Sequence, residues 1–256
     1  MDTGILDRLE CGELRAAERV DGTWAVHSEV KEAILELFRH SDVAPQAFEV
    51  AEPGSSPLFF DKRPLTVRRF DAGDGVRIVP GGSAVRRGAY LAPGVVCMPP
   101  MYVNVGAWVG PGSMIDSHAL VGSCAQIGAG VHVSAGCQIG GVLEPVGARP
   151  VIVEDGAFLG GNTGIYDGYL IGERAVLAAG VVLTRGTHVF DLVRERVVRR
   201  ETGQLAIPPG AVVVPGSRPA GGDFAREQGL QTACALIVKY RDAGTDAGTA
   251  LEEALR

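Results

Sequence analysis

The sequence has no surplus of basic residues, few aromatic residues and no long hydrophobic run. Its 256 residues include 24 Lys and Arg against 30 Asp and Glu, which gives a formal net charge of −6. This balance leaves no positive surface for a phosphate backbone, so we expect no nucleic-acid partner. No apolar stretch approaches the roughly 20 residues that cross a bilayer, and the start, "MDTGILDRLECGEL", lacks the features of a secretory signal. We therefore expect a cytoplasmic protein with no membrane partner.

Cysteine and histidine are too scattered for a disulfide framework or a metal site. The cysteines form an odd set without a C-x-x-C pair, and we interpret them as small buried apolar residues; they are Cys11, Cys97, Cys124, Cys137 and Cys234. A carbonic-anhydrase-like site would need three converging histidines. Only His118 and His132 lie in the regular part of the chain. We expect no metal.

Aliphatic residues recur at every sixth position through the middle of the chain. The stretch "SMIDSHALVGSCAQIGAGVHVSAGCQIGG" shows the period, and Gly, Ala or Ser crowd the positions after each aliphatic. Glycine accumulates where a backbone turns tightly and often. Two registers together contain thirteen aliphatic positions: Val103, Val109, Ile115, Val121, Ile127, Val133, Ile139, Val153, Leu159, Ile165, Ile171, Leu177 and Leu183.

A period of six fits neither a helix nor a simple two-faced strand, but it is typical of a β-helix. Each hexad supplies one short strand and one corner, and three hexads complete one turn of a triangular prism. The repeated aliphatic side chains then point inward and stack on their equivalents one turn away. We therefore predict a mainly β protein in which residues 71–216 form a β-helix.

The first part of the chain has a helical pattern instead. Val30, Ile34 and Leu37 follow the spacing of an amphipathic helix, and Ser28 is placed to cap its N-terminus. The stretch "ILDRLECGELRAAERV" suggests an earlier helix, and "DGTW" a turn between the two. We expect residues 1–70 to form a small N-terminal α-helical domain.

Two interruptions break the six-residue phase, near residues 140–150 and 187–210. A solenoid accommodates insertions as loops that leave a corner, so we expect external loops there. The apolar stretch Ala233–Val238 predicts a strand, and a short helix follows it. We expect residues 217–256 to cap the open end of the prism with this strand and helix, because exposed strand edges favour aggregation.

Several strings are more specific than a hexapeptide repeat. They include "VRRGAYLAPGVVCMPPMYVNVGAWVGPG", "GSCAQIG", "IGGVLEP", "FFDKRPL", "GVRIVP" and "CALIVKY". With them, essentially the whole chain resembles the tetrahydrodipicolinate N-succinyltransferase family. The resemblance implies a left-handed parallel β-helix and a homotrimer with active sites between subunits. It also implies a coenzyme A thioester as co-substrate, succinyl-CoA or acetyl-CoA, and a small amino dicarboxylate or related amino acid as acceptor.

The resemblance also assigns site residues. Arg77 in "GVRIVP" is expected to bind a substrate carboxylate, for which a guanidinium offers a bidentate fork. Asp116 in "MID" is expected to contact the attacking amine, because a carboxylate can orient an amine and accept its proton. The glycine-rich corners that contain Gly161, Ala179 and Gly180 are assigned to the coenzyme, where backbone N–H groups can stabilise the thioester oxygen.

The chain leaves the family pattern at two places. The family usually has Arg-Ser-Glu where this chain has Asn162, Thr163 and Gly164, so the second acid of the site is missing. It usually has Thr-Trp where this chain has Ser117 and His118. We expect Asn162 and Gly164 to border the substrate and His118 to take part in proton handling, since an imidazole titrates near neutral pH.

Other residues keep two interpretations. Asp167 is a candidate to replace the missing carboxylate. His132 in "GVHVSAG" is either a general base or a structural, hydrogen-bonded histidine. Cys124 fits corner packing better than a nucleophile. The paired arginines of "VVRRETG" fit a solvated loop better than an arm near the coenzyme phosphates.

Three functions follow from the sequence. The first is an acyl-CoA-dependent N-acyltransferase of this family, acting on an amino dicarboxylate or related amino acid, with a specialised pathway left open. The second is the housekeeping 2,3,4,5-tetrahydropyridine-2,6-dicarboxylate N-succinyltransferase of lysine biosynthesis. The third is a catalytically inactive trimeric ligand-binding scaffold. Retention of Arg77 and Asp116 argues against the third.

Overall fold

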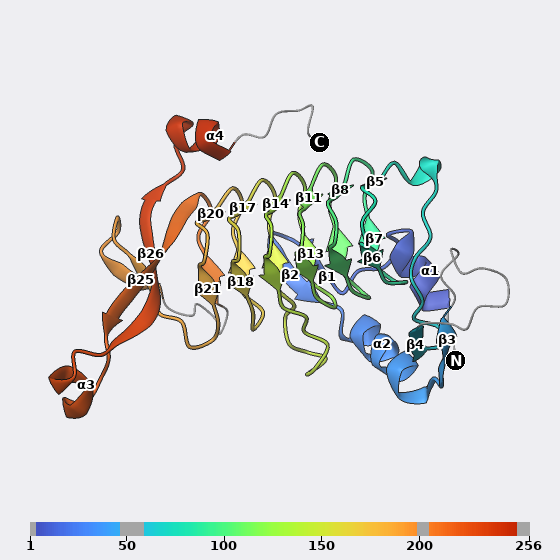
Figure 1. Cartoon of the computed structure of the whole chain (residues 1–256), viewed down its shortest axis with the longest axis horizontal. Coiled ribbons are helices and arrows are strands. Elements are labelled where there is room, and N and C mark those ends of the chain that lie inside the picture. Colours follow the sequence, from blue (N-terminus) through green and yellow to red (C-terminus); the bar gives the residue numbers. More distant parts are fainter. Residues whose placement is uncertain (1–3, 47–58, 199–204, 250–256) are drawn as a thin grey trace.

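The hexapeptide repeats build three parallel sheets that wrap around one core. The computed structural model describes residues 4–46, 59–198 and 205–249. Strands pair in parallel with the strand eighteen positions along the chain, as between Trp108 and Gln126, so that three strands complete one turn. In Figure 1 these turns form a row from the N-terminal elements to a long C-terminal arm. The prediction of a mainly β chain built from hexapeptide repeats is confirmed.

The strands of each face follow one another in chain order. The first face contains β7 (Tyr90–Leu91), β10 (Trp108–Val109), β13 (Gln126–Ile127), β16 (Ile152–Val153), β19 (Leu170–Ile171) and β24 (Ala206–Ile207). The second face contains β5 (Arg77–Ile78), β8 (Val96–Cys97), β11 (Met114–Ile115), β14 (His132–Val133), β17 (Phe158–Leu159) and β20 (Val176–Leu177). The third face contains β6 (Ala84–Val85), β9 (Tyr102–Val103), β12 (Leu120–Val121), β15 (Gln138–Ile139), β18 (Gly164–Ile165) and β21 (Val182–Leu183).

The aliphatic column fills the interior of the three faces. All thirteen aliphatic positions of the six-residue period are at most 1% exposed. Each is the second residue of a two-residue strand, so its side chain points inward and the first residue points outward. Packing Val, Ile and Leu one turn apart buries them without polar atoms, and this burial is the main stabilising term of the fold.

Two interruptions lengthen a turn without disturbing the strand pairing. Gln126 pairs with Ile152, twenty-six positions along, because residues 140–151 contain no strand. Leu170 pairs with Ala206, thirty-six positions along. This second insertion is more structured than a plain loop: it includes the antiparallel pair β22 (Val189–Asp191) and β23 (Arg196–Val198).

The N-terminal part contains strands as well as helices. Helix α1 (Gly4–Glu10) is shorter than the early helix that the sequence suggested, because Gly12 takes a φ of +81° and the chain continues into a hairpin of β1 (Ala17–Val20) and β2 (Thr23–Val26). A second hairpin joins β3 (Val43–Gln46) and β4 (Phe59–Lys62). A 3₁₀ turn, η1 (Ala72–Asp74), leads into the prism.

Helix α2 (Ser28–His40) agrees with the predicted amphipathic helix except at its cap. His27 is the N-cap residue and Ser28 begins the helix, so the expected serine cap is wrong. The buried face of α2 carries Val30, Ile34 and Leu37, which join Leu6 and Leu9 of α1 in a second apolar cluster.

Close packing holds the N-terminal part against the prism. A Cβ on Gly106 would lie 2.9 Å from Ile34 Cδ1, so a side chain at this corner would push α2 away. Lys31 is fully buried, and its Nζ donates to the carbonyl oxygens of Pro145 and Ala148 in the first insertion. Arg15 stacks on Trp108 at 3.9 Å from the ring centroid.

The C-terminal part is an arm more than a cap. Strands β25 (Ala211–Pro219) and β26 (Gln231–Tyr240) form an antiparallel hairpin that extends beyond the prism, with α3 (Asp223–Glu227) near its tip (Figure 1). The strand predicted at Ala233–Val238 is therefore longer at both ends. Strand β25 pairs in parallel with β20 and so covers the open edge of the second face, and β26 pairs in turn with β22.

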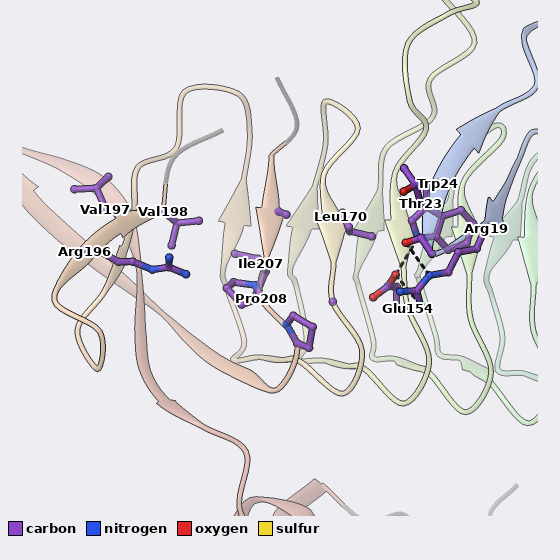
Figure 2. A pocket seen from close by; sticks show the side chains of 14 residues that line it. Arg19, Thr23, Trp24, Glu154, Leu170, Arg196, Val197, Val198, Ile207 and Pro208 are labelled. Atoms are coloured by element: carbon purple, nitrogen blue, oxygen red, sulfur yellow. Dashed lines mark hydrogen bonds and ion pairs between the residues drawn. The ribbon is translucent and has the colours of Figure 1, made fainter. Parts of the chain in front are cut away.

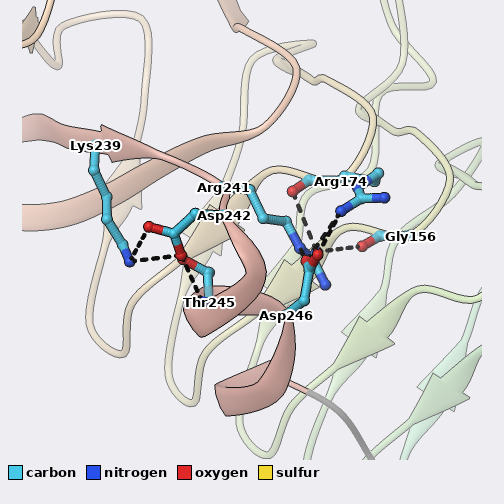
Figure 3. Close-up of polar contacts among 7 residues, drawn as sticks. All are labelled: Gly156, Arg174, Lys239, Arg241, Asp242, Thr245 and Asp246. Atoms are coloured by element: carbon cyan, nitrogen blue, oxygen red, sulfur yellow. Dashed lines mark hydrogen bonds and ion pairs between the residues drawn. The ribbon is translucent and has the colours of Figure 1, made fainter.

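Helix α4 (Ala243–Thr249) returns to the corner between the first and second faces. Asp246 lies between the guanidinium groups of Arg174 and Arg241, and Arg241 also donates to the carbonyl oxygen of Gly156 (Figure 3). These contacts tie the helix to two successive turns. None of the helices among the described residues is long and apolar enough to cross a membrane.

Removing one side chain of the aliphatic column tests its role. Ile127→Ala should lower the free energy of unfolding by about 2–5 kcal/mol, since it leaves a cavity where the column cannot collapse. Val182→Ala, at a position that is 50% exposed on the third face, should cost less than about 1 kcal/mol. Urea unfolding followed by circular dichroism measures both, and equal losses would contradict the assignment of the core.

Candidate active site

A ridge of stacked corners joins the second face to the third. It consists of Ser117–His118, Ala135–Gly136, Gly161–Asn162 and Ala179–Gly180, one pair from each successive turn. In the last three pairs the second residue donates its N–H to the carbonyl oxygen of the first residue one turn earlier, as Gly136 does to Ser117 at 2.8 Å, whereas His118 donates to Pro100. Six of the eight predicted site residues therefore lie on or directly beside one exposed ridge: Asp116, His118, Gly161, Asn162, Ala179 and Gly180.

Asp116 follows β11 at the edge of this ridge. Its side chain is 29% exposed, and its Oδ1 accepts a hydrogen bond of 2.7 Å from the N–H of Ser117. The other oxygen, Oδ2, lies 3.7 Å from Nε2 of His132. The carboxylate is thus fixed by the backbone on one side and reaches both solvent and a buried imidazole on the other.

His118 and Asn162 both sit at ridge positions with left-handed backbone. Their φ angles are +62° and +57°, a backbone region that residues other than glycine rarely adopt. Both residues are exposed. The side chain of Asn162 is also close to the turn below, because a Cβ on Gly136 would lie 2.3 Å from its Oδ1. Both residues therefore form part of the outer surface of the ridge.

Arg77 and Gly164 lie away from the ridge within one chain. Arg77 begins β5, which is separated from β11 by β8 alone, so the two backbones are about 10 Å apart. It is exposed on the second face. Gly164 begins β18 on the third face and pairs with Gln138. Within one chain, Arg77 and Gly164 thus lie on opposite sides of Asp116 along the prism, each two strands away.

Thr163 and Tyr166 define the surroundings of Gly164. Thr163 is fully buried and its hydroxyl lies 3.0 Å from the thiol sulfur of Cys137, so the middle residue of the triplet points inward. A Cβ on Gly164 would lie 2.7 Å from Cε2 of Tyr166. The tyrosine ring therefore lies over Gly164, the position at which the resemblance leads us to expect a glutamate. Sequence reasoning missed Tyr166; the signal was a bulky residue two positions after a glycine in a strand.

The three residues assigned to the coenzyme differ in their hydrogen bonds and in the space around them. The N–H of Gly180 already donates to the carbonyl oxygen of Gly161 at 3.0 Å, so it cannot also serve a ligand. A Cβ on Gly180 would meet nothing within 4 Å, whereas one on Gly161 would lie 3.3 Å from the carbonyl oxygen of Ala135. Ala179 is exposed between them.

A cavity of about 620 Å³ lies on the first face, away from Asp116. Trp24 and Arg19 of the β1–β2 hairpin approach Glu154 there, with Trp24 Nε1 donating to Glu154 Oε1 at 2.9 Å, and Arg196 lies across the cavity (Figure 2). None of the predicted site residues lines it. Its main contacts attach the hairpin to the prism.

The cysteines do not form a reactive site. Burial raises the pKa of the Cys97 and Cys124 thiols to about 12, and it also raises that of Cys137. Cys11 is exposed, so the expectation that all five are buried is wrong for this residue. Within the described ranges, no group of three His, Cys, Asp or Glu side chains is placed to hold a metal ion.

Comparison with known proteins decides the family. Residues 3–39 match the profile described as "Tetrahydrodipicolinate N-succinyltransferase N-terminal", and residues 150–185 match "Hexapeptide repeat of succinyl-transferase". The 2,3,4,5-tetrahydropyridine-2,6-dicarboxylate N-succinyltransferases of Burkholderia ambifaria and Burkholderia multivorans are each 42% identical over 258 residues. Each alignment covers 98% of this chain and 86% of the relative. The chain belongs to the tetrahydrodipicolinate N-succinyltransferase family.

Solved structures give weaker likenesses. A Campylobacter jejuni chain assigned to N-succinyltransferase activity is 18% identical, with a TM-score of 0.48, over 92% of this chain and 61% of that one. A hexapeptide-repeat acetyltransferase from Vibrio cholerae is 22% identical, with a TM-score of 0.34, over 47% of this chain and 65% of that one. Membership of the family therefore rests on the sequence matches.

Thiol titration tests the burial of the cysteines. At pH 8 an aromatic disulfide reagent should react rapidly with one thiol per native chain, Cys11, because a thiol with a pKa near 12 has almost no thiolate at that pH. The denatured chain should give five, the number in the sequence. Cys11→Ser should abolish the rapid phase; a rapid phase that survives this change would contradict the burial of the other four.

Proposed function

We propose that this protein is an acyl-CoA-dependent N-acyltransferase that transfers a succinyl group to the amine of an acyclic amino-oxo dicarboxylate. The observation that carries the proposal is the family membership over 98% of the chain, together with Asp116 held at the ridge. The relatives are named for succinyl transfer to tetrahydropyridine dicarboxylate. This favours the same donor and acceptor class here, with acetyl-CoA as the alternative donor.

Asp116 supplies the chemistry that the reaction needs. The acceptor arrives as an ammonium, which cannot attack a thioester until it loses a proton. A carboxylate within hydrogen-bond reach orients the amine and takes that proton, a contribution of typically 10² to 10⁴ in rate. The hydrogen bond from the Ser117 N–H fixes Oδ1, so Oδ2 is the oxygen that meets the amine. The amine then attacks the thioester carbon, and the coenzyme leaves as its thiol.

We place the coenzyme along the ridge. Gly161 and Gly180 have no side chains, so the thioester can approach the backbone there, and Ala179 adds a small exposed side chain. Asn162 and His118 then border the acceptor. This arrangement is supported by the stacking of the four corners in one line.

The remaining parts of the site come from a second subunit in this proposal. A left-handed prism in a homotrimer would place the ridge of one subunit in a groove against its neighbour. Arg77 and Gly164 are separated from Asp116 within one chain, and this supports the proposal. The substrate is held by its carboxylate at one end of the site and reacts through its amine at the other, so residues at both ends must line the same site. The proposed domains, 1–70, 71–216 and 217–256, would then divide into a helical part, the acyltransferase prism and the arm.

Asp116→Asn tests the mechanism. An amide keeps the size and one hydrogen-bond acceptor but cannot take a proton, so kcat should fall by at least about 100-fold. The assay follows thioester consumption with succinyl-CoA and 2-aminopimelate as acceptor analogue. Circular dichroism and size-exclusion chromatography should match those of the native protein. Asp155→Asn, at an exposed corner of the first face, is the matched control and should retain activity.

Native-like turnover by Asp116→Asn would refute the role of Asp116. Coenzyme binding by the native protein without turnover of any donor and acceptor would favour the inactive scaffold.

A specialised acceptor is the second candidate, and Tyr166 over Gly164 favours it. A neutral aromatic ring in place of a carboxylate should weaken binding of an acceptor that presents a positive group there. Native protein and the double variant Gly164→Glu/Tyr166→Val should be compared on acceptors that differ in their distal group. For each protein, kcat/KM for a dicarboxylate with a distal amine is divided by kcat/KM for 2-aminopimelate. This ratio should be at least about 10-fold higher in the double variant than in the native protein. An unchanged ratio would contradict a specialised pocket.

A further inference from the structure

A buried histidine lies behind the Asp116 carboxylate. His132 occupies the outward position of β14, directly beside Met114 of β11 and Phe158 of β17. The residue is 9% exposed, and its ring meets that of Phe158 edge to face with centroids 5.0 Å apart. The other outward positions buried on this face are apolar: Val96, Met114 and Val176 are 2%, 7% and 8% exposed, so a polar ring at this depth needs a specific reason.

The orientation of the two side chains supplies that reason. Nε2 of His132 faces Oδ2 of Asp116 at 3.7 Å, while Oδ1 is held by the Ser117 N–H at 2.7 Å. The two oxygens are thus distinguished: one is fixed by the backbone and the other is shared between the imidazole and the open side of the ridge. Contacts of catalytic groups are often long in a structure without substrate and shorten when it binds.

The sheet neighbours of His132 add no charge to this pair. Met114 and Phe158 are apolar, and the ring of His132 faces the titratable carboxylate of Asp116. The buried thiol of Cys137 interacts with Asp116 from the interior side. Arg77 lies on the same face but three strands away, and β8 and β11 separate it from β14.

We propose that His132 is a positioning residue for the proposed acyl transfer: Nε2 of its neutral imidazole receives the proton that Asp116 takes from the acceptor ammonium, and the imidazolium N–H formed in this way then orients Oδ2 of Asp116. The ammonium gives one proton to Oδ2, which passes it to Nε2, so the carboxylate is ionised again and the imidazole becomes imidazolium. The nitrogen lone pair attacks the thioester carbon, and the carbon–sulfur bond breaks. The second N–H proton goes to the leaving thiolate, and the imidazolium returns its proton to solvent.

Two substitutions separate orientation from proton uptake. His132→Gln keeps an N–H donor near the Nε2 position but cannot be protonated, whereas His132→Phe keeps only the packing. We expect kcat to fall at least about 10-fold in the glutamine variant and at least about 100-fold in the phenylalanine variant, with KM values within about threefold. The acidic limb of the kcat–pH profile should be lost in the glutamine variant. Met114→Leu, at a neighbouring outward position that is 7% exposed, is the packing control and should change neither.

Coupling to Asp116 is tested by a double variant. Residues that act as a unit are not additive, so His132→Gln/Asp116→Asn should be no slower than Asp116→Asn alone. Rates of both His132 variants within twofold of the native protein, or a retained acidic limb in the glutamine variant, would show that His132 only packs and would overturn the proposal.

A measurement without turnover separates this proposal from the proposed function on which it rests. The NMR titration midpoint of the His132 imidazole should fall by at least about one pH unit in Asp116→Asn, because a carboxylate stabilises the imidazolium. If the native protein transfers no acyl group but the midpoint shifts, the acyltransferase function fails and the pair stands. If transfer occurs and the midpoint does not move, the pair fails and the function stands.

Discussion

The stacking of inward aliphatic side chains from one turn to the next is the interaction on which the rest of the molecule depends. Two-residue strands are too short to be stable singly, and each becomes stable only between the strands one turn before and one turn after it. Because all thirteen aliphatic positions of the six-residue period are buried, the register of the outward residues beside them is fixed as well. The alignment of four corners in one ridge follows from this register.

Much of the fold could be predicted because a period of six leaves few alternatives. The inward positions, the mainly β class and helix α2 were all readable from spacing. The β1–β2 and β3–β4 hairpins were not, since β1 lies in a stretch with helical composition and is held as a strand by pairing with β2 and by the stack of Arg15 on Trp108. Such tertiary contacts override local propensity and leave no periodic trace.

The candidate site was predictable where it follows from the repeat. Asp116 stands directly after an inward isoleucine, so its place at a corner was implied by the spacing. The contact between Asp116 and His132 was not implied, because it joins residues one turn apart whose side chains lean toward each other along the face. The position of the Tyr166 ring also depends on a rotamer, which sequence does not specify. In the proposed homotrimer, the relation of Arg77 to Asp116 would depend on a partner subunit, and one chain carries no information about it.

The two insertions show that a turn can grow from eighteen residues to twenty-six or thirty-six while the strands on either side keep their partners. Length can therefore change at the corners without any cost in the core. In evolutionary terms, such a prism separates the residues under selection for folding from those under selection for chemistry. A lineage could acquire a new acceptor by exchanging corner and outward residues while it inherits the column unchanged.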